Sequence, residues 1–217
     1  MKTLWMALMG SLLLVGCASQ QPGYDYAAFR ESRPTSILVL PPVNHSPDIK
    51  ASNSLISQST LPLAESGYYV FPVALTNETF RQNGMTVAEE IQALPVNKLH
   101  QIFGADTALY LDITEYGTSY MVISSETAVT AKAKLVDLRN GKTLWEGTAR
   151  ASSAEQQSNS GGGLVGMLIV AVVDQIANTV LDKGHDIAGI TSARLLSAGT
   201  PNGLLYGPYS PKYQAQQ

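Results

Sequence analysis

The sequence predicts a single-domain α/β sandwich with a mixed sheet, followed by a C-terminal helix and an extended tail. Short apolar runs rich in β-branched residues alternate with segments of helical period, which is typical of this class. A hairpin signal at Asn140-Gly141 then places antiparallel strands after that alternation. With 217 residues, 45% of them hydrophobic and 14% charged, the chain is long and apolar enough to form one domain with its own core.

The start of the chain has the pattern of a lipoprotein signal peptide over residues 1–16. Lys2 supplies a positive charge, and the apolar run LWMALMGSLLLVG has the length of a signal-peptide core. The run ends at LVGC, which resembles a bacterial lipobox, the signal for thioether lipidation of Cys17 and cleavage before it. Cys17 is also the only cysteine, so the exported chain has no disulfide to form. We therefore expect Cys17 to carry the lipid.

Ala18 indicates where the lipidated protein goes. In lipoprotein sorting, an Asp at this position favours retention in the inner membrane, so Ala18 predicts an outer-membrane location facing the periplasm. Several acyl chains exceed the two signals that stable anchoring needs. Residues 17–35 carry the lipidated cysteine and are polar with Pro and Gly, which predicts a flexible tether before an α/β domain over 36–200.

The first elements of the domain are expected in the order strand, helix, strand. In residues 36–44 a short, β-rich apolar run is ended by two prolines, as in a buried strand. Residues 50–66 look helical, with Pro62 starting a new turn or kinking the helix. Residues 67–73 predict the second strand.

Two helices are expected in the middle of the chain. Thr86 and Glu89 have the spacing of a capping box before the first helix. Pro95 suits the first position of the second helix, and Gly104 suits its end. The apolar face of this second helix is expected to consist of Val96, Leu99, Ile102 and Phe103.

Three strands should follow. Residues 105–117 alternate, which turns Leu109, Leu111 and Ile113 toward one face. Tyr110, Asp112 and Thr114 should turn toward the other face. Residues 127–152 predict a hairpin whose Asn140-Gly141 pair suits a type I′ turn. The inward side of its first strand is expected to consist of Val129, Ala131, Ala133 and Leu135.

The run SGGGLVGMLIVAVVDQIA, residues 160–177, is the most apolar stretch beyond the N-terminus. Its uninterrupted part, 164–173, would span about 15 Å as a helix, half of the roughly 30 Å of a bilayer core. Asp174 at that depth would cost several kcal/mol. We expect residues 164–181 to form a helix that buries its apolar face on protein, either on the sheet of the same chain or against a neighbouring protomer. The Gly161–Gly163 run lacks the Lys-Ser/Thr of a phosphate loop and is expected to be a hinge.

The tail, residues 201–217, is rich in Pro, Gly and Tyr and cannot form a regular element. Its stretch GLLYGPYSPKY (203–213) nevertheless contains apolar side chains that are costly to leave in water. Two explanations remain open: an extended strap packed on its own domain, or a surface that docks a partner, since tyrosines suit interfaces. In the second case Tyr206, Tyr209 and Tyr213 would contact the partner.

Composition and motifs argue against several functions. The formal net charge of −3 leaves no basic face for nucleic acid. The histidines have no metal-binding spacing, so each is expected at the surface: His45, His100 and His185. Three carboxylates along one β-segment are expected to form its polar edge and not a catalytic pair: Asp106, Asp112 and Glu115. With no nucleophile motif either, we expect a protein that is not an enzyme and needs no metal or other cofactor.

Four stretches, DYAAFRESRPTSILVLPPVNHSPDIKAS, PLAESGYYVFPVALTNETFRQNG, IFGADTALYLDITEYGTSY and GLLYGPYSPKY, resemble a family of outer-membrane lipoproteins of unknown function that includes a neisserial antigen lipoprotein. The resemblance runs from about residue 24 to 213. It implies a fold similar to the TolB N-terminal domain and to the periplasmic part of CsgG-type lipoproteins. No catalytic residue is known for the family, so none is transferred.

Genes of this family commonly lie beside one for a CsgG-like lipoprotein. The resemblance therefore implies a non-enzymatic subunit or accessory of a cell-envelope assembly or export complex, forming homo-oligomers or binding a CsgG-like lipoprotein. CsgG has membrane-inserting hairpins where this chain has the plain run 164–173, so we expect no pore from this chain alone. The alternative is a lipoprotein regulator of a peptidoglycan synthase, because such activators share the fold and the anchoring, and a tether would help them to reach through the wall.

Overall fold

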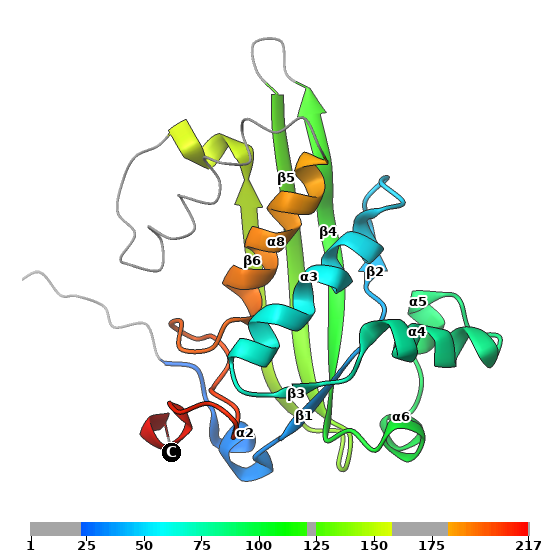
Figure 1. Cartoon of the computed structure of the whole chain (residues 1–217), viewed down its shortest axis with the longest axis vertical. Coiled ribbons are helices and arrows are strands. Elements are labelled where there is room, and N and C mark those ends of the chain that lie inside the picture. The colour runs from blue at the N-terminus through cyan, green and yellow to red at the C-terminus, as the bar shows by residue number, and fades with distance from the viewer. Residues whose placement is uncertain (1–22, 121–124, 158–181, 217) are drawn as a thin grey trace, which may run out of the picture.

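The computed structural model describes residues 23–120, 125–157 and 182–216 (Figure 1). Within these residues the strands form one six-stranded mixed sheet in the order β3-β1-β4-β5-β6, with β2 also paired to β4. The strands are β1 (Ser36–Val39), β2 (Val43–Asn44), β3 (Tyr69–Val70), β4 (Thr107–Tyr120), β5 (Ser125–Asp137) and β6 (Thr143–Ser152). Strand β1 runs parallel to β3 and β4, whereas β4, β5 and β6 form an antiparallel meander. The expected α/β fold with a mixed sheet is confirmed.

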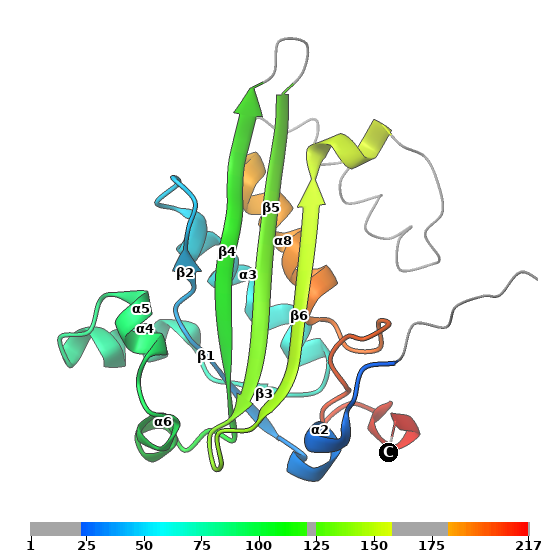
Figure 2. The same cartoon turned by 180° about the vertical axis from the view of Figure 1, so that it is seen from behind.

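Helices cover the two faces of this sheet unequally. The helices are α2 (Ala27–Ser32), α3 (Ala51–Glu65), α4 (Val73–Gln82), α5 (Ala88–Gln92), α6 (Val96–Phe103) and α8 (Lys183–Leu196), with 3₁₀ turns η2 (Ser153–Gln157) and η3 (Tyr213–Gln216). Helices α3 and α8 lie side by side on one face of the sheet (Figure 1). Seen from behind, strands β4 to β6 turn their other face toward the viewer (Figure 2). Helices α4 to α6 lie on the side of the sheet where β2 is.

Strand β1 lies between two separate hydrophobic cores, which explains why all of its residues are apolar or small. Ile37 and Val39 face the main core between the sheet and helices α3 and α8. Leu38 and Leu40 face a second core, built with side chains of α4, α5 and α6. All four side chains are completely buried. The strand expected from residue 36 onward is therefore confirmed as a buried strand that ends before the two prolines, and residues Val43–Asn44 beyond them form the separate strand β2.

The helices of the middle region differ from the expected ones at their ends. The capping box is wrong, because α5 begins at Ala88 with Val87 as its N-cap and no capping side chain. Pro95 is the N-cap of α6 and not its first residue. Gly104 ends α6 as expected: its φ of 69° is left-handed, and its N–H donates to the carbonyl of His100.

The apolar face expected for α6 is right for three of its four residues. Leu99 is completely buried, and Val96 and Phe103 pack beside it in the second core. Ile102 is 55% exposed, because it lies outside the face that meets that core. Helix α3 is continuous through Pro62 to Glu65; Pro62 lies in its last turn and is buried.

The alternation predicted in β4 is confirmed, since Leu109, Leu111 and Ile113 are completely buried in the main core. The hairpin of β5 and β6 is also confirmed, but its turn is not of type I′. A type I′ turn needs positive φ at both central residues, and here Gly141 has it and Asn140 does not. The strands are instead joined by a longer loop, closed by the bond from the N–H of Asp137 to the carbonyl of Lys142.

Residues 23–35 belong to the folded domain and not to the expected tether. Phe29 of α2 is 3% exposed and lies in the main core. The Tyr26 hydroxyl donates to the carbonyl of Gly203 at 2.5 Å, and the N–H of Tyr24 donates to the Asn202 side chain at 3.1 Å. The polar composition predicted a tether here, but the rings of Tyr24, Tyr26 and Phe29 pack on the domain. Residues 1–22, with Cys17 and Ala18, lie outside the described part of the chain.

The C-terminal helix that the structure describes is α8, at 183–196. The segment expected to be helical, 164–181, lies outside the described residues, as does the expected hinge. Within α8, Gly189 and polar Thr191 interrupt the apolar pattern, so that pattern alone does not predict this helix. Thr191 is nonetheless buried, because its hydroxyl bonds to the carbonyls of Ile187 and Val129.

Strand β6 lies at an edge of the described sheet, and side chains bond to its outward backbone groups. The N–H of Glu146 donates to the hydroxyl of Tyr24 at 3.0 Å. The carbonyl of Arg150 accepts from Arg194 at 2.7 Å, and the N–H of Ser152 donates to Glu155 at 3.1 Å. These contacts protect much of the edge against pairing with another strand.

No helix in the described part of the chain is both long enough and apolar enough to cross a membrane.

Candidate functional site

The strap, residues 203–213, lies against the turn between α3 and β3. The N–H of Gly207 donates to the carbonyl of Ser66 at 2.8 Å, and that of Tyr209 to the carbonyl of Gly67 at 3.1 Å. Leu204 is 1% exposed in the main core. The strap is therefore packed on its own domain, which was the first of the two explanations offered above.

Two glycines allow this close approach of the strap. A Cβ on Gly207 would lie 2.2 Å from the carbonyl oxygen of Gly67, and a Cβ on Gly67 would lie 2.4 Å from the nitrogen of Ser210. Both distances are far below ordinary contact, and the obstructing atoms belong to the backbone. Only residues without a side chain fit at these two positions.

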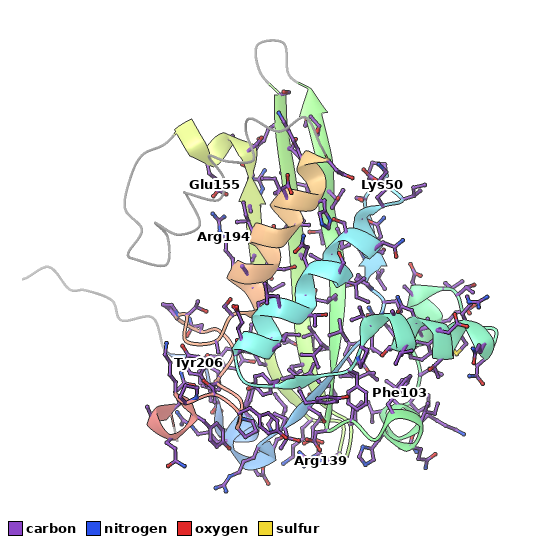
Figure 3. All side chains as sticks on the ribbon, viewed as in Figure 1. Lys50, Phe103, Arg139, Glu155, Arg194 and Tyr206 are labelled. Carbon is purple, nitrogen blue, oxygen red and sulfur yellow. The ribbon has the colours of Figure 1, made fainter. Side chains whose placement is uncertain are left out.

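A pocket of about 170 Å³ lies between the strap and α2. We call it the strap pocket; its lining residues are Phe29, Arg30, Arg33, Pro34, Tyr68, Leu205, Tyr206, Tyr213 and Gln216. Figure 3 shows Tyr206 beside α2, at the end of the molecule where the C-terminus lies. The Tyr68 hydroxyl donates to the carbonyl of Leu205 at 2.6 Å. Burial raises the pKa of Tyr68 far above its usual value, with a smaller contribution from Tyr213, so its hydroxyl stays protonated.

Cationic side chains surround the strap pocket. Arg30 and Arg33 are exposed, and neither guanidinium has a hydrogen-bond or ion-pair partner among the described residues. The ammonium group of Lys212 lies 3.4 Å from the Tyr206 hydroxyl and 5.3 Å from the centre of its ring. The combination of apolar walls and unpaired cations suits a ligand with an apolar group beside an anionic one.

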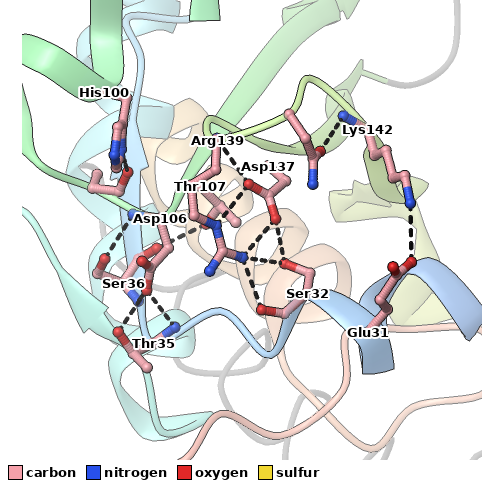
Figure 4. A network of polar contacts seen from close by, with 12 residues as sticks. Glu31, Ser32, Thr35, Ser36, His100, Asp106, Thr107, Asp137, Arg139 and Lys142 are labelled. Atoms are coloured by element: carbon pink, nitrogen blue, oxygen red, sulfur yellow. Dashed lines mark hydrogen bonds and ion pairs between the residues drawn. The ribbon is translucent and has the colours of Figure 1, made fainter. Parts of the chain in front are cut away.

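An ion pair between the buried Asp137 and the partly exposed Arg139 positions α2 beside this pocket (Figure 4). The Asp137 side chain is fully buried, and its two oxygens accept from Nε and Nη2 of Arg139 at 2.9 and 2.6 Å. The Ser32 hydroxyl donates to Asp137 at 2.7 Å, and Arg139 Nη2 donates to the Ser32 carbonyl at 2.8 Å. Burial alone would raise the pKa of Asp137, but the bonds from Arg139 and Ser32 outweigh it and lower that pKa.

Asp106 makes a similar connection to the segment after α2. It accepts from the N–H and the hydroxyl of Thr35 at 2.8 and 2.6 Å, and from the N–H of Ser36 at 3.3 Å (Figure 4). Burial again acts to raise its pKa, and the bonds from Thr35 lower it overall. The two carboxylates thus stay ionised. Asp137 holds α2 against the end of β5, and Asp106 holds the segment after α2 against the start of β4.

The three carboxylates identified in the sequence do not share a site. Asp106 bonds to Thr35, and Asp112 lies 3.6 Å from the imidazole of His45. Glu115 lies 3.0 Å from Arg150 on the neighbouring part of the sheet. Each carboxylate therefore has its own partners.

Two of the three histidines are bonded into the fold and are not simply at the surface. His45 is mostly exposed, as expected. The Nδ1 atom of His100 lies 2.8 Å from the carbonyl of Ala105. The ring of His185 lies between the Ser54 hydroxyl at 2.9 Å and the amide nitrogen of Gln58 at 2.8 Å.

The contacts of His185 decide its tautomer. An amide nitrogen can only donate, so Nε2 of His185 accepts from Gln58, and Nδ1 carries the proton that it donates to Ser54. His185 is thus not oriented to take a proton from the Ser54 hydroxyl. Across residues 23–120, 125–157 and 182–216, no three His, Cys, Asp or Glu side chains are grouped so that they could hold a metal ion.

Sequence reasoning identified the tyrosines of the strap and missed the rest of the pocket. Tyr206 and Tyr213 line it, whereas Tyr209 is 70% exposed and points away from the domain. Four of the residues missed lie in or directly after α2, in the segment expected to be a tether: Phe29, Arg30, Arg33 and Pro34. The available signal was the spacing of Arg30 and Arg33, which places two cations one turn apart.

Comparison with known proteins finds relatives along most of the chain. The family described as "Putative lipoprotein GNA1162-like" matches residues 24–209. A "Putative lipoprotein NMB1124/NMB1162" of Neisseria meningitidis serogroup B is 50% identical over 209 residues, which cover 96% of each chain. The crystal structure of lipoprotein GNA1162 from Neisseria meningitidis is 55% identical with a TM-score of 0.54, covering 67% of this chain and 100% of that one. A PelC dodecamer from Paraburkholderia phytofirmans is 16% identical with a TM-score of 0.43, covering 82% and 93%, too distant to inform function.

Proposed function

The chain belongs to the GNA1162-like lipoprotein family, and from this premise we propose that it is a non-enzymatic subunit or accessory of a cell-envelope assembly or export complex. In this proposal Cys17 carries the lipid, and the domain is anchored in the outer membrane and faces the periplasm. The Lys2-led apolar run that ends at LVGC supports the anchor, and Ala18 supports the outer membrane.

The anchor predicts a defined chemical end of the mature chain. Mass spectrometry of the N-terminal peptide should find acylated Cys17, and sucrose-gradient fractionation should place the protein with outer-membrane markers. A Cys17→Ser variant is the control and should stay unlipidated. An intact Met1, a free Cys17 thiol, or co-sedimentation with inner-membrane markers would contradict this part of the proposal.

The observation that carries the docking function is the outward position of Tyr209. The Tyr209 ring is 70% exposed, yet the backbone N–H of Tyr209 donates to Gly67, and that of Gly207, two residues earlier, donates to Ser66. An aromatic side chain on a backbone that is already fixed loses little freedom when it is buried by a partner. Such residues frequently dominate the energy of an interface. We propose that Tyr209, with Tyr206 and Tyr213 beside it, meets a second copy of the chain or a CsgG-like lipoprotein.

The docking role of Tyr209 is tested by affinity purification from crosslinked envelopes of cells that make the full-length protein. Tyr209→Ala should reduce the crosslinked partner about tenfold or more, while stability to urea changes by less than about 0.5 kcal/mol, since the ring is exposed. Leu75→Ala is the matched control, because Leu75 is equally exposed, at 66%, but lies on α4. Capture that is unchanged by Tyr209→Ala, or lost equally with Leu75→Ala, would remove the docking function from the strap.

A further inference from the structure

We propose that the strap pocket binds the C-terminal residue of a peptide chain, with an apolar side chain inside the pocket and its α-carboxylate between Arg30 and Arg33. The inference deepens the proposed docking function and rests on it, because the bound residue would be the chain end of the docked partner. Nothing in the family comparisons assigns a ligand to this pocket.

The pairing of the arginines is the first observation. The chain has six arginines, and all lie in its described part. Four of them form ion pairs with carboxylates: Arg81, Arg139, Arg150 and Arg194. The remaining two, Arg30 and Arg33, have no such partner among the described residues, and both line the strap pocket. Within the described residues, the two guanidinium groups without a carboxylate partner therefore lie at one pocket, where a planar fork of donors suits a carboxylate.

The size and lining of the pocket define the apolar part of the ligand. Its volume is about 170 Å³. A cavity of roughly 150 Å³ lined by apolar side chains can hold benzene, so one leucine or phenylalanine side chain fits and a long acyl chain does not. Phe29, Pro34 and Leu205 supply apolar walls. The Tyr68 hydroxyl is already bonded to the carbonyl of Leu205, so it does not leave an unsatisfied polar group facing the ligand.

The backbone that carries the two arginines is held in place before any ligand arrives. Arg33 has a left-handed φ of 46° as the C-cap of α2, and its N–H donates to the carbonyl of Phe29 at 3.0 Å. Ser32, between the two arginines, is fixed by the Asp137–Arg139 pair. Lys212 is on the strap, next to the ring of Tyr206. Because the backbone of α2 is fixed on both sides of Ser32, binding a carboxylate would require ordering of the arginine side chains but not of the chain that carries them.

The test uses the full-length protein in detergent and nuclear magnetic resonance titration with acetyl-Gly-Gly-Phe, carrying either a free carboxylate or a C-terminal amide. The acid should bind, and the amide should bind about tenfold more weakly or worse, since it loses the charge-assisted bonds. The double variant Arg30→Gln/Arg33→Gln should weaken binding of the acid by a similar factor. Arg81→Gln is the matched control, since Arg81 is exposed on α4 and pairs only with Glu78, and it should bind like the unchanged protein.

Equal binding of the acid and the amide, or binding of neither, would overturn the proposal. Phenylacetate is a further arm: if it binds as tightly as the peptide acid, the pocket takes a small organic acid and not a chain end. If the peptide acid does not bind, this inference falls. The docking function is tested separately by envelope crosslinking with Tyr209→Ala, so it can still stand. If the peptide acid binds but no partner is captured from envelopes, the pocket still binds a chain end, and the proposed docking function falls.

Discussion

Replacing Arg139 with alanine should destabilise the protein by about 3–5 kcal/mol, the cost of leaving one buried charge without its partner. The Asp137 side chain would remain fully buried, with only the Ser32 hydroxyl and a backbone N–H to stabilise its charge. Urea unfolding followed by the fluorescence of Trp145 measures the loss, since Trp5, the only other tryptophan, lies in the expected signal peptide. Arg81→Ala removes an exposed pair instead and should change stability by less than about 1 kcal/mol.

The loss caused by Arg139→Ala should also depend on pH. In the unchanged protein the pKa of Asp137 is lowered, so its stabilisation is present above the ordinary Asp pKa of about 4 and is lost as the pH falls through the lowered value. Without Arg139, the hydrogen bonds that lower the pKa of Asp137 no longer exceed the effect of burial, which raises it. The pKa therefore rises, and the folded protein favours the protonated carboxyl. The deficit should therefore be smaller at pH 3 than at pH 7. An equal deficit at both values would show that the loss comes from packing and not from the unpaired charge.

Replacing Trp145 with alanine should cost a similar amount, about 3–5 kcal/mol, because it empties a large volume of the main core. Trp145 is 1% exposed, and its Nε1–H donates to the carbonyl of Asn202 at 2.9 Å, just before the strap. Its ring also lies where a Cβ on Gly147 would be, so no neighbouring side chain on β6 can fill the space easily. Urea unfolding followed by circular dichroism measures the change without needing the tryptophan.

Trp145→Phe separates the two contributions of this residue. Phenylalanine keeps much of the apolar volume but leaves the Asn202 carbonyl without its donor, which should cost about 1–3 kcal/mol. Alanine should therefore be clearly worse than phenylalanine. If the two variants were equally stable, or if both matched the unchanged protein, the filling of the core by this ring would not be what stabilises the domain.

Much of the sheet could be predicted from the sequence, because each strand carries its own pattern. The alternation of residues 105–117 and the run after Ser36 are local signals, and burial in the structure follows them. The turn type at Asn140-Gly141 could not be predicted in the same way. Asp137 and Arg139 are held by Ser32, which is more than 100 residues away, and this contact accompanies a longer loop than the dipeptide alone suggests.

The strap pocket could not be predicted from local patterns either, because it is formed by residues far apart in the sequence. Its walls come from distant parts of the chain: α2 and the two residues after Ser32, Tyr68 in the middle, and residues 205–216. The polar composition around Arg30 predicts a tether, and only the burial of Phe29 in the domain shows that this segment is folded. The tyrosines of the tail could be identified because exposed aromatic residues are costly, but the sequence could not distinguish Tyr209, which is exposed, from Tyr206, which lines the pocket.

The packing of residues 23–35 on the domain limits how far the protein can stand from a membrane. If Cys17 carries the lipid, as we propose, six residue steps separate it from Gly23, and a fully extended chain covers roughly 20 Å over that length. Tyr24 is bonded to Asn202 beside the start of the strap, so the anchored end and the docking face share one end of the molecule (Figure 1). A partner of Tyr209 would then have to come to the bilayer surface, and a target on the far side of the cell wall would be beyond reach.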